Sequence, residues 1–301
     1  MSESDTDKLD AYAQKLSQHA DYRVVRRYRK PELYSAPPED RSKVKTGIYL
    51  DVETTGLDYQ SDHIIELAMV KFEFSSDGQL YRLGPEFDEL NDPGVPIPPE
   101  ITRITGITDE MVAGKVIEPG RVYEFIDEAA IIIAHNAGFD RKFVEASYAG
   151  FADKAWACSA RQVPWREAGF ESAKLEYLAY RQGFFYDGHR AANDCLAGIH
   201  VLSVTLESLE KTAFAELLER ARAKDYRLWA TNSPFESKDL LKARGYRWNN
   251  GDDGRPKSWF KDIPGDELDD ERAFLADKVY GEARTLPMEP VNAFNRFSAR
   301  I

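Results

Sequence analysis

Three consecutive strand-like runs in the first third of the chain restrict the folds that it can adopt. The first is GIYLDV at 47–52, the second is HIIELAMVKFEF at 63–74, and the third is QLYRLGPEF at 79–87. Their apolar and alternating patterns indicate β-strands. The TTG after the first run and Asp77–Gly78 before the third mark turns, so we expect three adjacent antiparallel strands.

Downstream of these runs, helical and strand patterns alternate. They predict, in chain order, a helix at 121–130, a strand at 131–136, a helix at 139–150 ended by Gly150, a strand at 155–161, and helices at 175–184 and 190–209. Antiparallel strands followed by this alternation predict an α/β domain, with a mixed sheet flanked by helices. The proline-rich segment 91–112 suits neither a central strand nor a helix interior, so we expect an ordered loop that wraps the surface.

Composition divides the chain into parts. Residues 7–30 have apolar residues at helical spacing, which predicts one or two helices that end at Pro31. The stretch 34–47 is rich in proline, serine and charge and predicts a linker. We expect a helical N-terminal extension and linker at 1–44, the α/β domain at 45–210, and a small α+β appendage with a tail at 226–301.

The appendage follows a charged helical stretch at 211–224 and holds three of the five tryptophans. Its pattern predicts a strand at 227–231, a helix at 234–245 capped by Ser233 and ended by Gly245, a hairpin of 246–250 and 257–263 around the turn GDDG, and a helix at 270–281. The tail 285–301 has no clear period, so it either packs back or stays extended.

Bulk properties narrow the class of protein. The net charge of −12 argues against binding nucleic acid by general electrostatic attraction, although residues 1–45 and 220–301 are each slightly basic. No signal segment and no run near the roughly 18 apolar residues of a membrane helix is apparent. The two cysteines, Cys158 and Cys195, fit neither a disulfide framework nor a zinc site. We expect a soluble cytoplasmic protein that does not bind membranes.

Five residues carry the chemistry: Asp51, Glu53, Asp140, His189 and Asp194. Four are carboxylates in or beside apolar runs, where a buried charge needs a compensating cation. Each has an ordinary explanation alone, because D-x-E is common, an acidic residue in a first helical turn favours the helix dipole, and a loop histidine is usually a surface residue. Together they predict a metal site with a histidine that can accept a proton near neutral pH.

The order of these motifs is specific. D-x-E, then H-N-x-x-F-D, then H-x-x-x-x-D resembles the DEDD superfamily of 3′-to-5′ exonucleases, and the histidine spacing resembles its DEDDh, or DnaQ-like, branch. That branch includes RNase T and the proofreading subunit of bacterial DNA polymerase III. Further matches are TTGL after Glu53, IIEL at 64–67 and TGIT at 105–108. The resemblance covers roughly residues 46–205.

The resemblance implies a ribonuclease H-like mixed five-stranded sheet and a two-metal site that takes Mg²⁺ or Mn²⁺. Asp51 would bridge two divalent cations, and Glu53 and Asp194 would hold the cation nearer the attacking water. Asp140 would help to position the second cation, and His189 would act as general base. Hard oxygen ligands suit these metals rather than zinc, and two such ions supply what phosphodiester hydrolysis needs.

Further residues are candidates for binding the terminal nucleotide. They are Thr54, Thr55, Gly56, Leu57, Asn136 and Phe139. Among them Leu57 is a candidate wedge against the base, whereas Asn136 and Phe139 are expected mainly to shape a strand-to-helix turn. Two positions depart from the family pattern: Cys158 and Ser159 replace the aspartate-threonine pair of many members, which concerns substrate choice, and Thr105 replaces a frequent histidine. All five catalytic letters remain, so neither change implies inactivity.

The appendage mixes basic and aromatic residues in a way that suits base stacking and phosphate pairing. The candidate strand contacts are Lys238, Lys242, Arg244, Arg247, Trp248 and Trp259. The preferred alternative is that the aromatic residues form a small core and the charges keep it soluble. The basic run RVVRRYRK at 23–30 offers a similar choice between phosphate contact and a solvated helical face.

From these features we expect a magnesium-dependent 3′-to-5′ exonuclease that releases nucleoside 5′-monophosphates from single-stranded ends, DNA rather than RNA. An RNase T-like exoribonuclease and a catalytically silent nucleic-acid-binding or polymerase-associated subunit are the alternatives. A replication or repair polymerase is the expected protein partner. The sequence leaves open whether the protein is a monomer or a homodimer.

Overall fold

The computed structural model describes residues 3–301, with side chains described from residue 7 onward. The chain forms two compact units, Met1–Leu218 and Glu219–Ile301. Residues 1 and 2 of the expected N-terminal extension lie outside the described part. Within that part, no helix combines the length and apolar character needed to cross a membrane.

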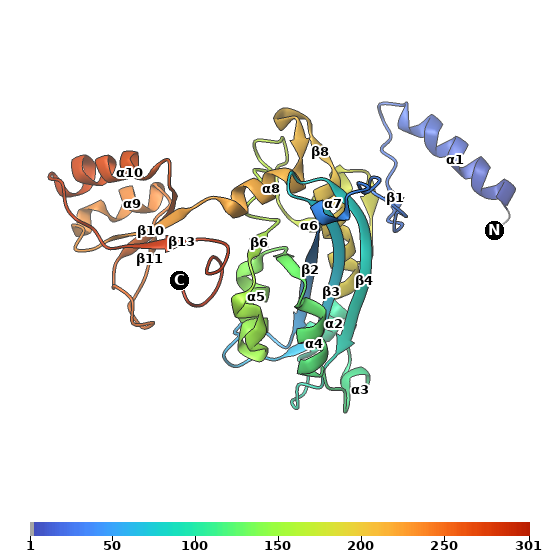
Figure 1. Ribbon diagram of the computed structural model, residues 1–301, viewed down its shortest axis with the longest axis horizontal. Coiled ribbons are helices and arrows are strands. Elements are labelled where there is room, and N and C mark those ends of the chain that lie inside the picture. Colours follow the sequence, from blue (N-terminus) through green and yellow to red (C-terminus); the bar gives the residue numbers. More distant parts are fainter. Residues whose placement is uncertain (1–2) are drawn as a thin grey trace. The chain divides into compact units, whose positions relative to one another are not determined.

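The first unit is built on a five-stranded sheet with the order β4-β3-β2-β5-β6. Its strands are β2 (Val44–Thr54), β3 (Ile64–Ser75), β4 (Leu80–Leu90), β5 (Ala129–Ala134) and β6 (Trp156–Cys158). β2, β3 and β4 are antiparallel neighbours, whereas β5 runs parallel to both β2 and β6. The mixed, helix-flanked sheet predicted from the sequence is therefore confirmed (Figure 1).

Helices connect the strands and cover the sheet. They are α4 (Pro119–Ile126), α5 (Ala137–Ser147), α6 (Leu175–Arg181), α7 (Ala191–Ser203) and α8 (Ala213–Arg222). α7 packs across β2, β3 and β4, which brings its N-terminus to the end of β2. This approach is close, because a Cβ atom on Gly198 would lie 2.1 Å from a ring carbon of Tyr49.

Several predicted helix ends are wrong. α5 ends at Ser147 because Tyr148 after it is extended, and Gly150, the predicted end, lies in a 3₁₀ turn. α7 ends at Ser203 instead of 209 because the β-branched pair Val204–Thr205 is extended, and β8 (Thr205–Leu206) then pairs with β9 (Lys211–Thr212). α6 ends at Arg181, three residues before its predicted end.

The proline-rich segment was expected to be a surface loop, and that prediction is wrong in part. It contains two short helices, α2 (Pro99–Thr105) and α3 (Asp109–Val112). Proline is tolerated at the first helical position, where its missing N–H has no helical partner. Apolar residues of the segment also form a buried cluster with β3; its buried members are Ile65, Ile97, Ile107 and Val112.

The N-terminal prediction is corrected as well. α1 (Glu3–Ser17) is followed by extended chain, and β1 (Arg26–Arg27) pairs in parallel with β7 (Phe184–Phe185). The basic run is thus neither a helical face nor free chain. A 3₁₀ turn at Arg41–Lys43 leads directly into β2.

The second unit is a four-stranded sheet with the order β11-β12-β10-β13. Its elements are β10 (Asp225–Ala230), α9 (Lys238–Ala243), β11 (Arg247–Trp248), β12 (Trp259–Pro264), α10 (Leu268–Leu275) and β13 (Met288–Val291), with a 3₁₀ turn at Phe235–Ser237 and a π-helical turn at Ala276–Tyr280. The predicted hairpin corresponds to the antiparallel β11–β12 pair. Leu228, Leu241 and Ile263 form its core with other apolar residues.

Two details of this unit differ from expectation. Ser233 does not cap the helix, because the 3₁₀ turn begins after Pro234 and α9 follows Ser237 without a side-chain cap. The tail contributes β13, which pairs with β10 although its sequence has no strand periodicity. The sequence pattern predicts three strands in this unit, and the fourth strand of the sheet forms through its tertiary pairing with β10.

Candidate functional site

Asp51 and Glu53 lie two residues apart on β2 and face the same side of the sheet. Across the antiparallel pair, Asp51 is opposite Ala68 and Glu53 is opposite Glu66. α7 covers this side and carries Asp194 in its first turn. Strand alternation and the close packing of α7 on β2 therefore bring carboxylates 140 positions apart to one place.

Among the described residues, Asp51, Glu53 and Asp194 form a group in which one carboxylate oxygen of each lies within 4.8 Å of the others. Asp194 Oδ1 accepts a hydrogen bond from the Tyr186 hydroxyl at 2.9 Å. Asp194 Oδ2 is buried and has no hydrogen-bond partner. Three converging carboxylates, one of which also has a buried oxygen without a hydrogen-bond partner, fit a divalent cation such as Mg²⁺ or Mn²⁺.

Asp140 lies beside this group but is not part of it. It is buried in the first turn of α5, and its Oδ1 accepts the Val52 backbone N–H at 3.3 Å. The left-handed Asn136, with φ of 76°, makes the turn from β5 into that helix. Asp140 is thus held next to β2 by its hydrogen bond from Val52.

Burial raises the pKa values of all four carboxyl groups, and neighbouring carboxylates add to the rise for Asp51, Glu53 and Asp140. Burial raises the pKa of Glu53 to about 8, helped by the charges of Asp194 and Glu66. The pKa of Asp140 rises to about 7 through burial, and that of Asp194 rises to about 6 through burial despite its bond from Tyr186. Burial and the neighbouring carboxylates raise the pKa of Asp51 well above its usual value. A bound cation would remove this cost.

His189 lies in the loop before α7 and has left-handed backbone geometry, with φ of 60°. Its side chain is 56% exposed, and its Nε2 is 3.5 Å from Glu176 Oε1. The imidazole is therefore accessible to a bound molecule rather than packed into the core. No described hydrogen bond joins it to the three-carboxylate group.

The end of β2 and the loop after it hold four of the six predicted nucleotide-binding residues. Thr54 and Thr55 are buried, and Thr54 Oγ1 donates to Gly56 O at 2.6 Å. A Cβ atom on Gly56 would lie 2.4 Å from Asp62 Oδ2, so the loop wraps tightly around that carboxylate. Leu57 is 85% exposed at its tip. The backbone of the loop is thus fixed while one apolar side chain projects outward.

Asn136 and Phe139 occupy the β5–α5 turn. Asn136 Oδ1 accepts from Arg161 Nη2 at 3.3 Å. The Phe139 ring packs on Phe143, with centroids 4.8 Å apart. Both residues serve the local turn and its packing.

A buried polar chain lies beneath the site. His135 Nε2 faces the Ala173 carbonyl at 2.7 Å and must donate to it, so Nδ1 accepts from the Ser159 hydroxyl at 2.9 Å. Ser159 in turn receives the Tyr49 hydroxyl at 2.7 Å. Burial lowers the pKa of His135 to about 4, which keeps this ring neutral. Ser159, one of the departures from the family pattern, thus links β2 to β5.

The sequence patterns did not single out three residues that hold the site, namely Glu66, Arg190 and Tyr186. The fully buried Glu66 accepts Arg190 Nη2 at 2.8 Å and the Ala191 backbone N–H at 2.9 Å, which anchors the start of α7. Tyr186 bonds Asp194. A glutamate inside the apolar run HIIELAMV was a usable signal for Glu66, whereas nothing local marked Tyr186.

The candidate strand contacts lie in the second unit and are mostly engaged within it. The Lys238 ammonium lies 4.6 Å from the Phe235 ring centroid, and Arg244 pairs with Glu271. The Arg247 guanidinium stacks on Phe260, and Lys242 is exposed. Trp259 packs against Trp248, with ring centroids 5.6 Å apart. Trp248 is 51% exposed and is the accessible aromatic residue of this set.

Comparison with known proteins identifies the fold of the first unit. Residues 48–202 match the RNase T family, described as exonucleases. DNA polymerase III of PolC type from Thermotoga petrophila is 29% identical over 211 residues, and that from Lacticaseibacillus paracasei is 36% identical over 194 residues. These matches span 65% and 61% of this chain but only 14% and 12% of the relatives.

Solved structures agree at the level of fold. A zinc-bound E. coli exonuclease I–ssDNA complex aligns with a TM-score of 0.51 and 16% identity, covering 73% of this chain and 63% of that one. The same enzyme with a dA16 oligonucleotide gives a TM-score of 0.50 at 16% identity, with the same coverage. Since the family match spans half of the chain, the expected resemblance is confirmed: the chain belongs to the RNase T exonuclease family of the DEDD superfamily.

Proposed function

We propose that this protein is a metal-dependent 3′-to-5′ exonuclease that trims single-stranded DNA. The observation that carries the proposal is the meeting of Asp51, Glu53 and Asp194 within 4.8 Å, with no basic side chain of the described residues paired to them. Family membership supports the activity. The neighbour whose title names a single-stranded DNA complex motivates the choice of DNA.

In this proposal Asp51, Glu53 and Asp194 would hold one divalent cation, and Asp51 with Asp140 would hold a second. Mg²⁺ or Mn²⁺ held there would lower the pKa of water and neutralise charge on the phosphoryl and leaving oxygens. The raised pKa values of Glu53 and Asp140 support these roles, because a cation would stabilise their ionised forms.

The remaining roles belong to the loops around the carboxylates. His189 accepts the proton of the attacking water, for which its exposure of 56% leaves it accessible. The fixed backbone of Thr54–Gly56 holds the terminal nucleotide, and the projecting Leu57 contacts its base. Asn136 and Phe139 support the turn that presents Asp140.

We assign residues 1–44 to an extension, 45–210 to the exonuclease domain and 226–301 to an appendage that holds the strand upstream of the cleaved end. Exposed Trp248 supports the last role, since stacking on an aromatic ring is tolerant of base identity. The PolC-type relatives support a replication or repair polymerase as protein partner.

The test compares purified protein on 5′-labelled single-stranded DNA and RNA of the same sequence. We expect stepwise shortening of DNA with Mg²⁺ and none with EDTA. Asp194→Asn, which keeps the side-chain shape but removes a charged ligand, is the matched control for a contaminating nuclease. Trimming of RNA but not of DNA would show that the substrate is RNA, which agrees with the name of the RNase T family. Absence of metal-dependent trimming on both would leave a silent binding subunit.

A further inference from the structure

Residues 23–35 form a segment, here called the strap, that precedes the family-matched region 48–202. Its β1 pairs with β7, through hydrogen bonds from Arg26 N–H to Gly183 O at 2.9 Å and from Tyr28 N–H to Phe185 O at 2.8 Å. Within residues 3–301, β7 pairs with no other strand. The strap therefore supplies the whole strand pairing of β7.

Side chains add to this backbone pairing. Arg23 donates to the Tyr180 carbonyl at 3.1 Å and stacks over the Tyr180 ring at 4.6 Å, at the C-terminal end of α6. A cation is favourable there because the helix end carries partial negative charge. Arg27 stacks 5.0 Å from the Phe185 ring centroid and pairs with Asp187 at 2.7 Å. The strap is thus tied to both sides of β7.

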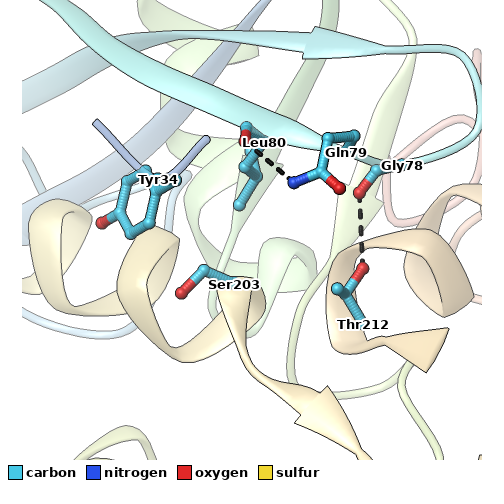
Figure 2. A pocket seen from close by; sticks show the side chains of 6 residues that line it. All are labelled: Tyr34, Gly78, Gln79, Leu80, Ser203 and Thr212. Atoms are coloured by element: carbon cyan, nitrogen blue, oxygen red, sulfur yellow. Dashed lines mark hydrogen bonds between the residues drawn. The ribbon is translucent and has the colours of Figure 1, made fainter. Parts of the chain in front are cut away.

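The other end of the strap is anchored on β4 and α7. The Tyr34 and Ser35 backbone N–H groups both donate to Tyr81 O, at 2.7 and 3.2 Å. Tyr34 also lies 5.8 Å from the ring of His200 on α7 and lines a cavity of about 110 Å³ with Ser203. Figure 2 shows Tyr34 above Ser203 beside the strand that carries Leu80. Contacts at both ends restrict the strap's position.

What β7 leads into is the loop that holds His189. Directly after it, Tyr186 bonds Asp194, and the Asp187 carbonyl accepts from Asn193 Nδ2 at 2.9 Å. His189 then takes its left-handed backbone conformation before Arg190 is held by Glu66. A non-glycine residue with positive φ is uncommon and persists where the surrounding structure holds it. The Glu66–Arg190 pair holds one side, and β7 with the strap holds the other.

We propose that the strap positions the His189 loop, so that β1–β7 pairing sets the rate of the exonuclease reaction proposed above. The strap acts through His189 and contacts neither substrate nor metal. The strap precedes residues 48–202, the region that the family model matches, and so it acts on the loop from outside that region. The inference rests on the proposed function and on the assignment of His189 to proton transfer.

The test uses a pair of full-length variants that differ in backbone hydrogen bonds. Arg26→Pro/Tyr28→Pro removes the two N–H donors to β7, whereas Arg26→Ala/Tyr28→Ala removes the same side chains and keeps the donors. The β1–β7 pair is separate from the five-stranded sheet that carries Asp51 and Glu53, so we expect the fold of that sheet to persist in both variants. Arg26→Pro alone, against Arg26→Ala, serves as the milder pair if the double variant does not fold by circular dichroism.

We expect the proline variant to lose between about tenfold and 10²-fold in kcat relative to the alanine variant, with KM for a short oligonucleotide unchanged. The same comparison is made in a His189→Ala background, where a strap that acts through His189 has no further effect. Such non-additive loss would support the proposal.

Two results would overturn it while leaving the exonuclease proposal intact. One is equal kcat for the proline and alanine variants. The other is the same fractional loss with and without His189, which would show that the strap supports the fold in general. A wild-type protein without metal-dependent trimming would instead refute the proposed function, and the strap's effect on rate with it.

Discussion

The two units of this protein bury carboxylates in opposite ways. In the first unit, Asp51, Glu53 and Asp194 converge without a paired cation, and burial raises the pKa of each, with the charges of neighbouring carboxylates adding to the rise at Asp51 and Glu53. In the second, Glu271 is 3% exposed but bonds Arg244 and Lys261, each at 3.2 Å. Burial alone would raise the pKa of Glu271, yet these hydrogen bonds bring it below its usual value.

The difference separates structure from function. A carboxylate whose charge is satisfied inside the protein stabilises a particular packing, as Asp225 also does with Arg296 at 2.8 Å. A cluster of carboxylates that repel one another lowers the stability of the fold, and such clusters occur at functional sites, where a bound ligand offsets the repulsion. Removing a charge should therefore have opposite consequences in the two units.

The largest expected effect is on the first unit's cluster. Asp51→Ala removes an oxygen shared by both proposed cations, which should lower kcat by on the order of 10⁴-fold. Glu271→Ala should leave kcat unchanged in the same assay of oligonucleotide trimming with Mg²⁺. A fully active Asp51→Ala protein would show that these carboxylates do not hold the catalytic metal.

His189 offers the next sharpest contrast. His189→Ala should lower kcat by roughly 10² to 10⁴-fold through loss of the proton acceptor, with metal affinity retained. His19→Ala removes another exposed histidine, outside the carboxylate site, and is the control. Single-turnover rates and Mn²⁺ titration check both quantities. A matching loss of metal affinity would indicate that His189 is a ligand.

Stability should reverse the order of the two units. Glu271→Ala strands the charges of Arg244 and Lys261 and should lower the free energy of unfolding by about 3 kcal/mol. The control is Asp269→Ala on the same helix, whose carboxylate is 95% exposed, and which should change that free energy by less than about 0.5 kcal/mol. Chemical denaturation measures both. Equal effects would mean that Glu271 is not held as a buried ion pair.

Acidity sharpens the comparison further. Raised carboxyl pKa values stabilise the fold when the groups are protonated, and this stability is lost as pH rises through about 6 for Asp194, 7 for Asp140 and 8 for Glu53. In EDTA, the free energy of unfolding should fall as pH rises from roughly 4, where unfolded carboxyl groups ionise, to about 8, by up to about 1.4 kcal/mol per pH unit for each group that the fold keeps protonated.

Saturating Mg²⁺ should remove that slope, and Glu53→Gln should reduce it without metal. Thermal melts across the pH range provide the measurement. Unchanged slopes after both treatments would assign the pH dependence to groups outside the carboxylate site.

Features set by residues close together in the sequence could be predicted from it, whereas features set by contacts between distant residues could not. Strand alternation placed Asp51 and Glu53 on one face, and motif order related them to Asp140, His189 and Asp194. The interactions that support the site were not visible in the sequence. The Glu66–Arg190 pair joins residues 124 positions apart, and the β1–β7 pairing joins residues about 158 positions apart. β13 was missed for the same reason: its strand state comes from pairing with β10.

The smallest expected effect concerns the exposed aromatic residue of the second unit. Trp248→Ala should raise KM for a long single strand by about fivefold, the loss of roughly 1 kcal/mol of base stacking, and leave a dinucleotide unaffected. Leu240→Ala, an exposed aliphatic residue of α9 that cannot stack, is the matched control. Equal loss on both substrates would show that Trp248 serves packing against Trp259. The aromatic residues of the second unit would then stabilise its fold, as its buried ion pairs do.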